Sequence, residues 1–452
     1  MRIAVIGTGY VGLVSGACFA EFGHEVVCAD CDGGRIAALE SGAVPFYEPG
    51  LDDLVARQTG AGRLRFTADL RAAVAEAEAV LITVGTPEDR RGQAGAADVT
   101  FVTQAAAQIA PYLDPRRPVV VVTKSTVPVG TARAVRRVIA QENPAAVFDV
   151  CANPEFLREG AAIGDFMRPD RVVIGVDSAR AEAVMRALYR PLYLNETPMV
   201  VTSIENAEII KYAANAFLAT KVSFINEIAD LCERAGGDVQ QVAKALGLDG
   251  RIGAKFLHAG PGFGGSCFPK DVRALGATAQ EYGVDMRIAR AVDEINAQRP
   301  RRMADKIIAA CGGDVRGKRI GVLGLSFKPN TDDLREAPAL PIIRALQEAG
   351  AVIAAHDPAA MDKAKALLAA IDWCDDAYDA AQGAHALAIV TEWNEYRALD
   401  LQRLADSMVE RRLIDLRNIY HPDEALAQGF HYVSVGRADM VPAARTQLRE
   451  AS

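Results

Sequence analysis

The first thirty residues constrain the fold most, because they combine apolar runs, a glycine-rich turn and an acidic residue in a fixed order. The apolar run at 2–6 is followed at once by Gly-Thr-Gly-Tyr-Val-Gly at 7–12, and a helical pattern extends over 13–22. A second apolar run at 25–29 ends at Asp30. A G-x-G-x-x-G motif alone is a weak signal, but this order of strand, motif, helix, strand and acid is typical of a dinucleotide-binding βαβ unit.

Each part of this unit has a physical role. Gly7 makes the turn, Gly9 admits the pyrophosphate, and Gly12 lets helix and strand pack closely. The helix N-terminus attracts the phosphates. Asp30 is expected to hydrogen-bond the adenosine ribose hydroxyls and to repel a 2′-phosphate, so the sequence favours NAD over NADP; Arg35 lies close enough to complicate this preference.

Polar clusters follow three further apolar runs, at 80–84, 119–122 and 148–151. Ligands of open α/β sheets bind beyond the carboxyl ends of the strands. We therefore expect the polar residues at these ends to converge on one crevice; they are Thr86, Thr126, Glu155 and Glu159. Taken singly, each is equally well explained by helix capping or turn chemistry.

After residue 195 the pattern becomes helical. A long helix is predicted over 203–235, with more helix to about 247 and again over 272–299. Lys211 and Asn215 are four residues apart and share a face of the long helix. A lysine in such an apolar stretch either extends its amine to solvent or points into a site.

A glycine-rich loop at 260–265 leads into Cys267, with Lys270 and Asp271 close behind. Free cysteine has a pKa of roughly 8.5, and a nearby cation or helix N-terminus lowers it, which makes the thiolate a nucleophile. The alternative is a glycine-rich turn beside a buried, inert cysteine.

A second α/β unit begins at Gly317 and resembles a degenerate repeat of the first. It opens with the stretch 318–328, a helix follows, and the run 352–358 comes next; strands at 386–390 and 413–414 complete it. The glycine fingerprint is incomplete, so a different nucleotide-like ligand is expected. Lys328, Arg335 and Arg417 are candidates for phosphate contacts or, equally, solvated surface charges.

These patterns predict an α/β protein with two Rossmann-like, doubly wound parallel-sheet domains joined by a long central helix. We place the domains at 1–199, 200–300 and 301–437, followed by a polar tail at 438–452. The first binds the dinucleotide and the second carries the cysteine loop. The segment 88–97 has the composition of a flexible loop.

Composition narrows the function classes. The 452-residue chain has a formal net charge of −8, which argues against nucleic-acid binding. There is no apolar run long enough to span a bilayer, and a strand starting at residue 2 leaves no room for a signal peptide. Eight scattered cysteines fit reduced thiols in the cytoplasm. We read Cys28 and Cys31 as a strand end and expect no metal.

An NAD site together with a nucleophilic cysteine suits oxidation beyond the aldehyde. A thiolate captures an aldehyde as a thiohemiacetal, a second hydride leaves to give a thioester, and water hydrolyses it. A plain alcohol dehydrogenase needs only a base, so the cysteine predicts a four-electron oxidation.

Six motifs together carry a resemblance to the UDP-glucose/GDP-mannose dehydrogenase family that extends to about residue 435. In chain order they are GTGYVG, VGTP, STVPVGT, NPEFLREG, FGGSCFPKD and GLSFKPNTDDLRE. The phenylalanine at position 268, directly after the cysteine, resembles the residue found there in the family's UDP-glucose members. GDP-mannose enzymes more often carry leucine at this position. The resemblance implies two Rossmann-like domains and oxidation of the sugar C6 alcohol to a carboxylate with two NAD, giving UDP-glucuronate.

The resemblance also implies roles for individual residues. Cys267 would be the nucleophile, and Lys211, with Asn215 beside it, would stabilise the developing oxyanion. Asp271 would position water or act as a base near the thiol. Glu155 would be the general base of thioester hydrolysis, with Thr126 helping to hold the water.

Binding residues carry over in the same way. Positions that match the family's NAD site are Gly7, Gly9, Val11, Gly12, Asp30, Arg35, Thr86, Thr126, Glu159, Lys270 and Arg335. Positions that match its sugar-nucleotide site are Glu155, Phe156, Leu157, Arg158, Glu159, Lys211, Asn215, Phe256, Leu257, His258, Ala259, Gly260, Gly264 and Lys328, with Arg417 the phosphate candidate noted above. Arg251 resembles an arginine that reaches the sugar from a neighbouring subunit, which implies a homodimer or higher oligomer.

The sequence departs from the family at His258, where many relatives have a longer or aromatic polar residue, and in the loop 88–97. Three alternatives stay open. The first is a dehydrogenase for another nucleotide sugar, such as GDP-mannose or UDP-N-acetylmannosamine. The second is a one-step hydroxyacid dehydrogenase, which would not need Cys267. The third is a non-catalytic nucleotide-binding protein, against which the cysteine, lysine and aspartate speak.

Overall fold

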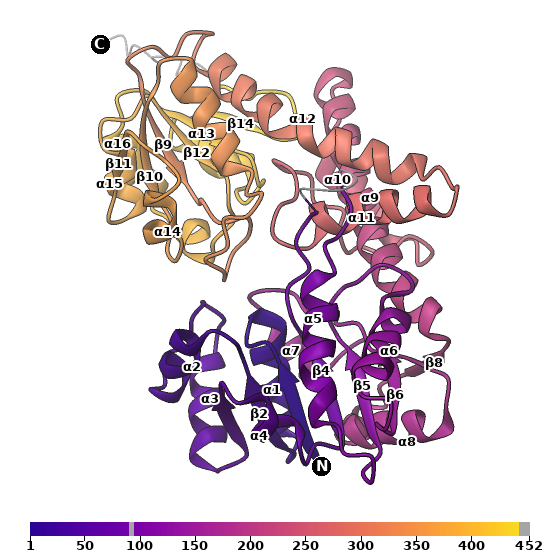
Figure 1. Cartoon of the computed structure of the whole chain (residues 1–452). Coiled ribbons are helices and arrows are strands. Elements are labelled where there is room, and N and C mark those ends of the chain that lie inside the picture. The colour runs from indigo at the N-terminus through magenta and orange to yellow at the C-terminus, as the bar shows by residue number, and fades with distance from the viewer. Residues whose placement is uncertain (90–94, 443–452) are drawn as a thin grey trace, which may run out of the picture. The chain divides into compact units, whose positions relative to one another are not determined.

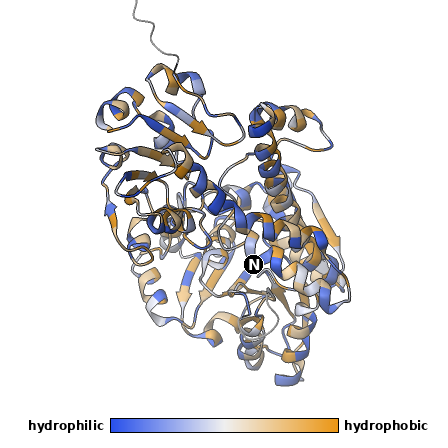
Figure 2. Cartoon of the chain, turned by 90° about the horizontal axis from the view of Figure 1, so that it is seen from above, coloured by the Kyte–Doolittle hydropathy of each residue, from blue (hydrophilic) through white to orange (hydrophobic). Residues whose placement is uncertain are grey.

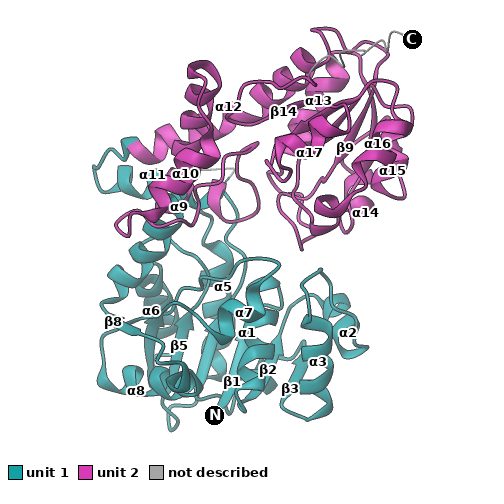
Figure 3. Cartoon of the chain, turned by 180° about the vertical axis from the view of Figure 1, so that it is seen from behind, with its two compact units in different colours: residues 1–216, 270–287 teal, residues 217–269, 288–452 magenta. Residues whose placement is uncertain are grey.

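The computed structural model describes residues 1–89 and 95–442. The chain divides into two compact units (Figure 3). Unit 1 comprises Met1–Ala216 and Lys270–Arg287, and unit 2 comprises Phe217–Pro269 and Ile288–Ser452. Helix α9 (Ile204–Ala235) is 32 residues long, begins in unit 1 and ends in unit 2. Each unit contains one α/β sheet, so the predicted fold of two such domains with a long central helix is confirmed.

The sheet of unit 1 has the strand order β3-β2-β1-β4-β5-β6-β7-β8 (Figure 1). Its strands are β1 (Arg2–Ile6), β2 (Glu25–Ala29), β3 (Leu64–Thr67), β4 (Ala79–Ile82), β5 (Val119–Thr123), β6 (Phe148–Ala152), β7 (Val172–Val176) and β8 (Met199–Thr202). All neighbours are parallel except β6 and β7, which are antiparallel. The order from β3 to β6 is that of a dinucleotide-binding sheet.

Helices cover both faces of this sheet, which explains why its strands are nearly continuous apolar runs. Successive β1 side chains enter opposite cores: Ile3 and Val5 pack with α1, and Ala4 and Ile6 with α5. The helices of unit 1 are α1 (Tyr10–Glu21), α2 (Gly33–Glu40), α3 (Leu51–Gly60), α4 (Leu70–Val74), α5 (Thr100–Ile109), α6 (Thr131–Glu142), α7 (Ala162–Met167), α8 (Ala179–Leu188) and most of α11 (Phe268–Glu281), with 3-10 turns at Ala110–Tyr112 and Arg190–Asn195.

The sheet of unit 2 has the order β11-β10-β9-β12-β13-β14, with parallel neighbours throughout. Its strands are β9 (Arg319–Leu323), β10 (Val352–His356), β11 (Ile371–Trp373), β12 (Ala386–Ile389), β13 (Arg412–Asp415) and β14 (His431–Ser434). Its helices are α10 (Val239–Leu248), α12 (Arg287–Ala310), α13 (Ala339–Glu348), α14 (Met361–Lys365), α15 (Ala377–Ala381), α16 (Leu401–Ser407) and α17 (Pro422–Ala427), with a 3-10 turn at Asn394–Ala398. Figure 2 shows hydrophilic and hydrophobic residues interleaved along the helices, as expected where one face is buried.

The structure differs from the sequence expectations in several elements. Strands β3, β7, β8, β11 and β14 were not predicted; most are short, and β3, β8, β11 and β14 lie at sheet edges. The single helix predicted over 272–299 is two helices, separated near Gly283 with its φ of +73°, and α12 continues through Pro300. Residues 90–94 of the predicted flexible loop and 443–452 of the predicted tail lie outside the described residues. Among residues 1–89 and 95–442, no helix is long and apolar enough to cross a membrane.

Candidate active site

The turn between β1 and α1 has the geometry of a phosphate-binding loop. Gly7 has a φ of +103°, which favours glycine, and a Cβ on Gly12 would lie 1.9 Å from the Gly7 carbonyl oxygen. A Cβ on Gly9, in contrast, would meet nothing within 4 Å. Gly9 precedes α1, and no side chain caps that helix N-terminus. The open space and the uncapped N–H groups fit the pyrophosphate of a dinucleotide.

Asp30 closes this turn at the end of β2. Its carboxylate accepts hydrogen bonds from the Thr8 N–H at 2.7 Å and the Thr8 hydroxyl at 2.8 Å. The Arg35 guanidinium lies 3.2 Å away, so the arginine noted in the sequence does contact this acid. Burial by itself would raise the pKa of Asp30, but these hydrogen bonds, one from the Asp32 N–H and the Arg35 charge bring it below its ordinary value. The acid is therefore held ionised, as ribose recognition requires.

The ends of β4 and β5 meet through two of the predicted residues. The Thr86 hydroxyl donates to the Thr126 carbonyl oxygen at 2.8 Å. The adjacent Ser125 hydroxyl donates to the Val84 carbonyl oxygen at 2.7 Å. Two of the polar clusters predicted at strand ends thus lie side by side in unit 1.

Lys211 of α9 reaches the third cluster. Its Nζ lies 3.0 Å from Glu155 Oε1, and the two side chains are only 4% and 5% exposed. The Lys211 amine also lies over the Phe156 ring, 5.3 Å from its centre. The Lys211 amine therefore does not extend to solvent, which excludes one of the two interpretations of this lysine.

Asn215, one turn further along α9, belongs to a second polar group. Its amide donates to Asp271 Oδ2 at 2.7 Å, and Lys270 Nζ lies 2.6 Å from Asp271 Oδ1. Asp271 stands in the first turn of α11 and is almost fully buried. The structure thus brings Lys211 with Glu155, and Asn215 with Asp271, onto consecutive turns of one helix.

A second buried lysine, which sequence reasoning missed, lies at the end of β5. Lys124 Nζ bonds Asn153 Oδ1 at 3.2 Å and the Tyr189 hydroxyl at 3.1 Å. Burial lowers the pKa of Lys124 to about 8, although the charge of Glu155 opposes this. Asn153 precedes Glu155 by two residues, so this network supports the strand end that carries the acid. Its only signal in the sequence is a lysine directly after an apolar strand.

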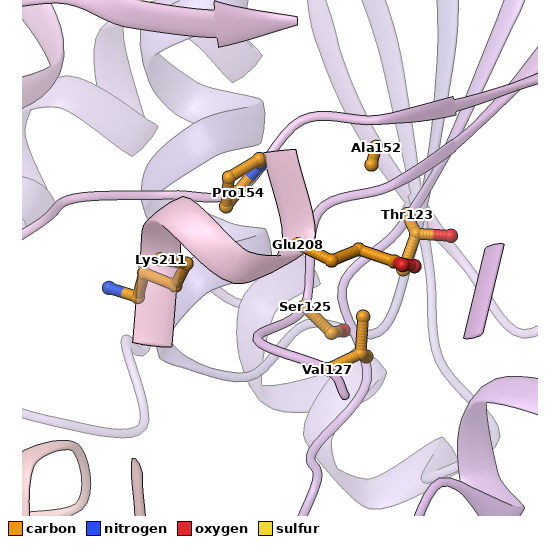
Figure 4. Close-up of a pocket in the computed structure, with 7 residues that line it drawn as sticks. All are labelled: Thr123, Ser125, Val127, Ala152, Pro154, Glu208 and Lys211. Atoms are coloured by element: carbon orange, nitrogen blue, oxygen red, sulfur yellow. The ribbon is translucent and has the colours of Figure 1, made fainter. Parts of the chain in front are cut away.

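Glu208 was also missed, and it lines a small cavity with Lys211 (Figure 4). The other lining residues are Thr123, Ser125, Val127, Ala152 and Pro154. The Glu208 side chain extends towards Thr123, whereas Lys211 points away from it (Figure 4). The Glu208 carboxylate accepts from the Gly130 N–H at 2.7 Å and the Ala132 N–H at 2.8 Å, at the start of α6. Burial raises the pKa of Glu208 to about 7.

The segment after Glu155 is anchored by contacts of its own. Arg158 forms an ion pair with Asp165 at 2.6 Å, and Leu157 packs at the edge of the core. Glu159 is largely buried. The buried Glu48 accepts hydrogen bonds from the Tyr10 hydroxyl and from the Ala162 N–H, which links the dinucleotide turn to this segment.

In unit 2 the glycine loop packs against the segment that follows β9. The Gly265 N–H donates to the Arg335 carbonyl oxygen at 2.8 Å, and a Cβ on Gly264 would lie 2.3 Å from the Glu336 carbonyl oxygen. Cys267 is partly exposed and directly precedes α11. The Ser266 hydroxyl lies 3.6 Å from its sulfur. All other cysteines are buried except Cys31, so the inert reading of Cys267 loses its main support.

The basic candidates of unit 2 lie around the same loop. Arg417 Nη1 would be 3.3 Å from a Cβ on Gly260, and Arg417 also donates to the Val390 and Phe327 carbonyl oxygens. Lys328 Nζ lies 5.2 Å from the centre of the Phe327 ring. The Arg335 guanidinium, 62% exposed, pairs with Asp333 at 2.7 Å.

The residues before the glycine loop differ in their burial. Leu257 and Ala259 belong to the core of unit 2, whereas His258 is exposed. Phe256 has a φ of +66°, unusual for a residue other than glycine. Arg251 is 89% exposed and pairs with Asp249 at 2.6 Å. The predicted sugar-nucleotide residues are therefore divided between the two units.

Taken together, a dinucleotide-binding sheet, a buried lysine–glutamate pair and a partly exposed cysteine before a helix define an NAD-dependent dehydrogenase. Models of the UDP-glucose/GDP-mannose dehydrogenase family match the chain in three parts: the NAD binding domain at residues 1–193, the central domain at 205–298 and the UDP binding domain at 321–422. The chain belongs to this family.

Individual relatives extend the comparison. A UDP-glucose 6-dehydrogenase of Rhizobium meliloti (strain 1021) is 57% identical over 441 residues, covering 97% of this chain and 100% of the relative. The UDP-glucose 6-dehydrogenase TuaD of Bacillus subtilis (strain 168) is 47% identical, with 96% and 93% covered. The solved structure of a UDP-glucose dehydrogenase from Pyrobaculum islandicum has a TM-score of 0.88 at 38% identity, covering 96% of this chain and 98% of that one.

Proposed function

We propose that this protein oxidises UDP-glucose to UDP-glucuronate with two NAD and one water. The observation that carries the proposal is the placement of Cys267, which is partly exposed directly before α11, in whose first turn stands the buried Asp271. A nucleophilic thiol is needed only if the oxidation passes beyond the aldehyde. The relatives named above support UDP-glucose as the substrate.

The residues divide the reaction between them. When bound, NAD would supply the hydride acceptor for each of the two oxidations. The Cys267 thiolate adds to the C6 aldehyde formed first, and Lys211 and Asn215 stabilise the resulting oxyanion. Asp271 acts near the thiol as a base or by positioning water. After the second hydride has left, Glu155 takes a proton from the water that attacks the thioester, and Thr126 holds that water. Cys267 leaves as a thiolate, and the C6 carboxylate is released.

The binding residues form two sets, one for NAD and one for the sugar nucleotide. We propose that Gly7, Gly9, Val11, Gly12, Asp30, Arg35, Thr86, Thr126, Glu159, Lys270 and Arg335 contact NAD. Within unit 1 the fit is supported by the open space at Gly9 and by the carboxylate of Asp30. The sugar nucleotide contacts residues 155–159, Lys211, Asn215, 256–260, Gly264, Lys328 and Arg417.

The test is the number of NADH molecules formed per UDP-glucose when the sugar nucleotide is limiting. The proposal expects two for the native protein. A ratio of one would contradict the thioester route and indicate a simple alcohol dehydrogenase. Turnover of GDP-mannose or UDP-N-acetylmannosamine in place of UDP-glucose would keep the chemistry and replace the substrate.

We also propose that the protein is a homodimer or a higher homo-oligomer. The C-terminal half of α9 carries large apolar side chains seven residues apart, and Phe217, Phe224 and Leu231 are 65%, 49% and 60% exposed. A helix with such a stripe can pair with a second copy of itself. Arg251, on the exposed segment after α10, would then reach a neighbouring site. Light scattering of native protein and of F224D is expected to give a larger mass for the native chain.

Two further expectations are kept as proposals. The first is the division into an NAD domain at 1–199, a central domain at 200–300, a UDP-sugar domain at 301–437 and a tail at 438–452. The second is a cytoplasmic location, which is supported by eight cysteines that are all free.

A further inference from the structure

The loop that leads to Cys267 has a backbone conformation that needs external support. Gly262 and Gly265 have φ values of +110° and +82°. A Cβ on Gly264 would overlap the Glu336 carbonyl oxygen, at 2.3 Å. Glycine residues can adopt this backbone conformation, but without contacts to the rest of the protein the loop could also adopt many others. Contacts must therefore select the observed conformation.

Asn296 of α12 holds the middle of the loop. Its Oδ1 accepts from the Phe263 N–H at 2.8 Å, and its Nδ2 donates to the Phe263 carbonyl oxygen at 2.9 Å. One amide thus satisfies both backbone polar groups of a buried residue. A Cβ on Gly262 would lie 2.8 Å from Asn296 Oδ1, so this contact also explains why residue 262 is glycine.

The beginning of the loop is held by Arg299, one turn along α12, and by Asn226 of α9. Arg299 Nε donates to the Gly260 carbonyl oxygen at 3.0 Å, and Asn226 Oδ1 accepts from the Gly260 N–H at 2.8 Å. The Arg299 side chain is 2% exposed and pairs with Asp230, one turn after Asn226. Three side chains from two helices therefore bind the beginning and the middle of the loop.

We propose that Asn296 and Arg299 are positioning residues that hold loop 260–265 and thereby fix the position of the Cys267 thiol and of the loop's own sugar-nucleotide contacts, Gly260 and Gly264. Neither touches a reacting atom in the proposed mechanism, on which this inference rests. Their effect on the reaction is transmitted through the backbone of the loop. A displacement of about 1 Å at a reacting group can slow turnover by roughly a hundredfold.

The molecule contains a matched control. Arg302, three residues after Arg299, pairs with the same Asp230 at 2.7 Å, but its hydrogen bond ends on that carboxylate and its side chain is 53% exposed. R299K and R302K therefore change the same ion-pair network, and only R299K removes the Arg299 donor to the loop carbonyl oxygen. N296A tests the other contact without altering a charge.

The experiment uses full-length protein in a C31S background, because Cys31 is the other exposed thiol. Three quantities are measured for N296A, R299K and R302K: kcat and KM with UDP-glucose, the pH profile of Cys267 alkylation by iodoacetamide, and the thermal unfolding midpoint. C267S provides the alkylation blank. We expect N296A and R299K to lower kcat by roughly tenfold or more and to change the alkylation profile, while R302K stays within about twofold.

The proposal is overturned if N296A and R299K keep the kcat and alkylation profile of the parent protein. It is equally overturned for Arg299 if R302K reproduces the loss in R299K, since the effect would then come from Asp230. A fall in kcat that only tracks the folded fraction, with an unchanged profile for the folded protein, also contradicts positioning. The alkylation profile does not depend on the substrate, so it decides the matter even if UDP-glucose proves not to be oxidised.

Discussion

In both units an aspartate follows the second strand and accepts a hydrogen bond from the turn after the first strand, but the surroundings of the two aspartates differ. In unit 1, Asp30 after β2 accepts from the Thr8 N–H at 2.7 Å. In unit 2, Asp357 after β10 accepts from the Leu325 N–H at 2.7 Å. In both, the turn after the first strand begins with a glycine at positive φ, +103° at Gly7 and +91° at Gly324.

The difference lies in what else binds the acid. Asp357 also accepts from the N–H groups of Ser326, Ala359 and Ala360 and from Trp393 Nε1, and it is 1% exposed. Asp30 is 9% exposed. Asp357 thus accepts from four backbone N–H groups, whereas Asp30 accepts from those of Thr8 and Asp32 and pairs with Arg35. The position that corresponds to Gly9 is occupied by Ser326. Unit 2 therefore has a glycine turn and a hydrogen-bonded acid like those of unit 1, but a serine in place of Gly9, and its residues 321–422 match a UDP binding domain.

The largest expected effect is the loss of stability that D357A causes in unit 2. Removing a buried acceptor leaves several N–H groups unsatisfied at roughly 1–3 kcal/mol each, so we expect a loss of at least about 3 kcal/mol. Both tryptophans, Trp373 and Trp393, belong to unit 2. Denaturant unfolding followed by tryptophan fluorescence therefore reports on this unit. D30A is the matched control, and an equal shift of the fluorescence midpoint in D30A would break the comparison.

Next in size is a pH effect in unit 1. Burial raises the pKa of Glu208 from 4.5 to about 7. The unfolded chain releases this proton at lower pH than the folded chain, so the associated stability is present below about pH 4.5 and is lost as the pH rises through 7. At about 1.4 kcal/mol per pKa unit, the loss is on the order of 3 kcal/mol.

The measurement is the difference in thermal midpoint between the native protein and E208Q from pH 5 to 8. We expect the thermal midpoint of the native protein to fall relative to that of E208Q as the pH rises, because Glu208 ionises and the glutamine cannot. Glu205, on the same helix, is the control, since the Arg133 hydrogen bond lowers its pKa and E205Q should show no such trend. A difference independent of pH for E208Q would refute the assignment.

A third prediction concerns Gly9. Because a Cβ here meets no protein atom within 4 Å, G9A should fold normally yet place a methyl group where the pyrophosphate approaches. We expect NAD affinity to fall by roughly tenfold, or about 1.4 kcal/mol, when measured by calorimetric titration. G60A, whose Cβ is equally unobstructed at the end of α3, should bind NAD normally. Undiminished NAD affinity in G9A would remove the main functional contrast with Ser326.

The smallest expected effect is at the end of the second sheet. R417K loses the guanidinium that reaches the Val390 and Phe327 carbonyl oxygens beside Gly260. We expect KM for UDP-glucose to rise a few-fold, up to roughly tenfold, with NAD affinity unchanged. R411K, which alters a surface pair with Asp406 in the same unit, is the control. A change in NAD affinity instead would contradict the separate roles of the two sheets.

Much of the fold could be read from the sequence because the information is local. The unit of β1, α1 and β2 combines a buried run, a glycine turn and an acid within thirty residues. Edge strands such as β3 and β11 were missed, because they are short and mix polar with apolar residues. The antiparallel step from β6 to β7 also has no local signal, since direction is set by pairing.

The candidate site divides in the same way. The sequence by itself determined where the glycine turn, the acid at Asp30 and the cysteine with its glycine-rich loop lie in the chain, since each belongs to a short motif of recognisable residue types. Only the tertiary structure decided that Lys211 meets Glu155, that Lys124 and Glu208 are buried beside them, and that Asn296 holds Phe263. The Lys211–Glu155 and Asn296–Phe263 contacts join residues 56 and 33 positions apart in the chain. The burial that shifts the pKa values of Lys124 and Glu208 exists only once the layers have packed.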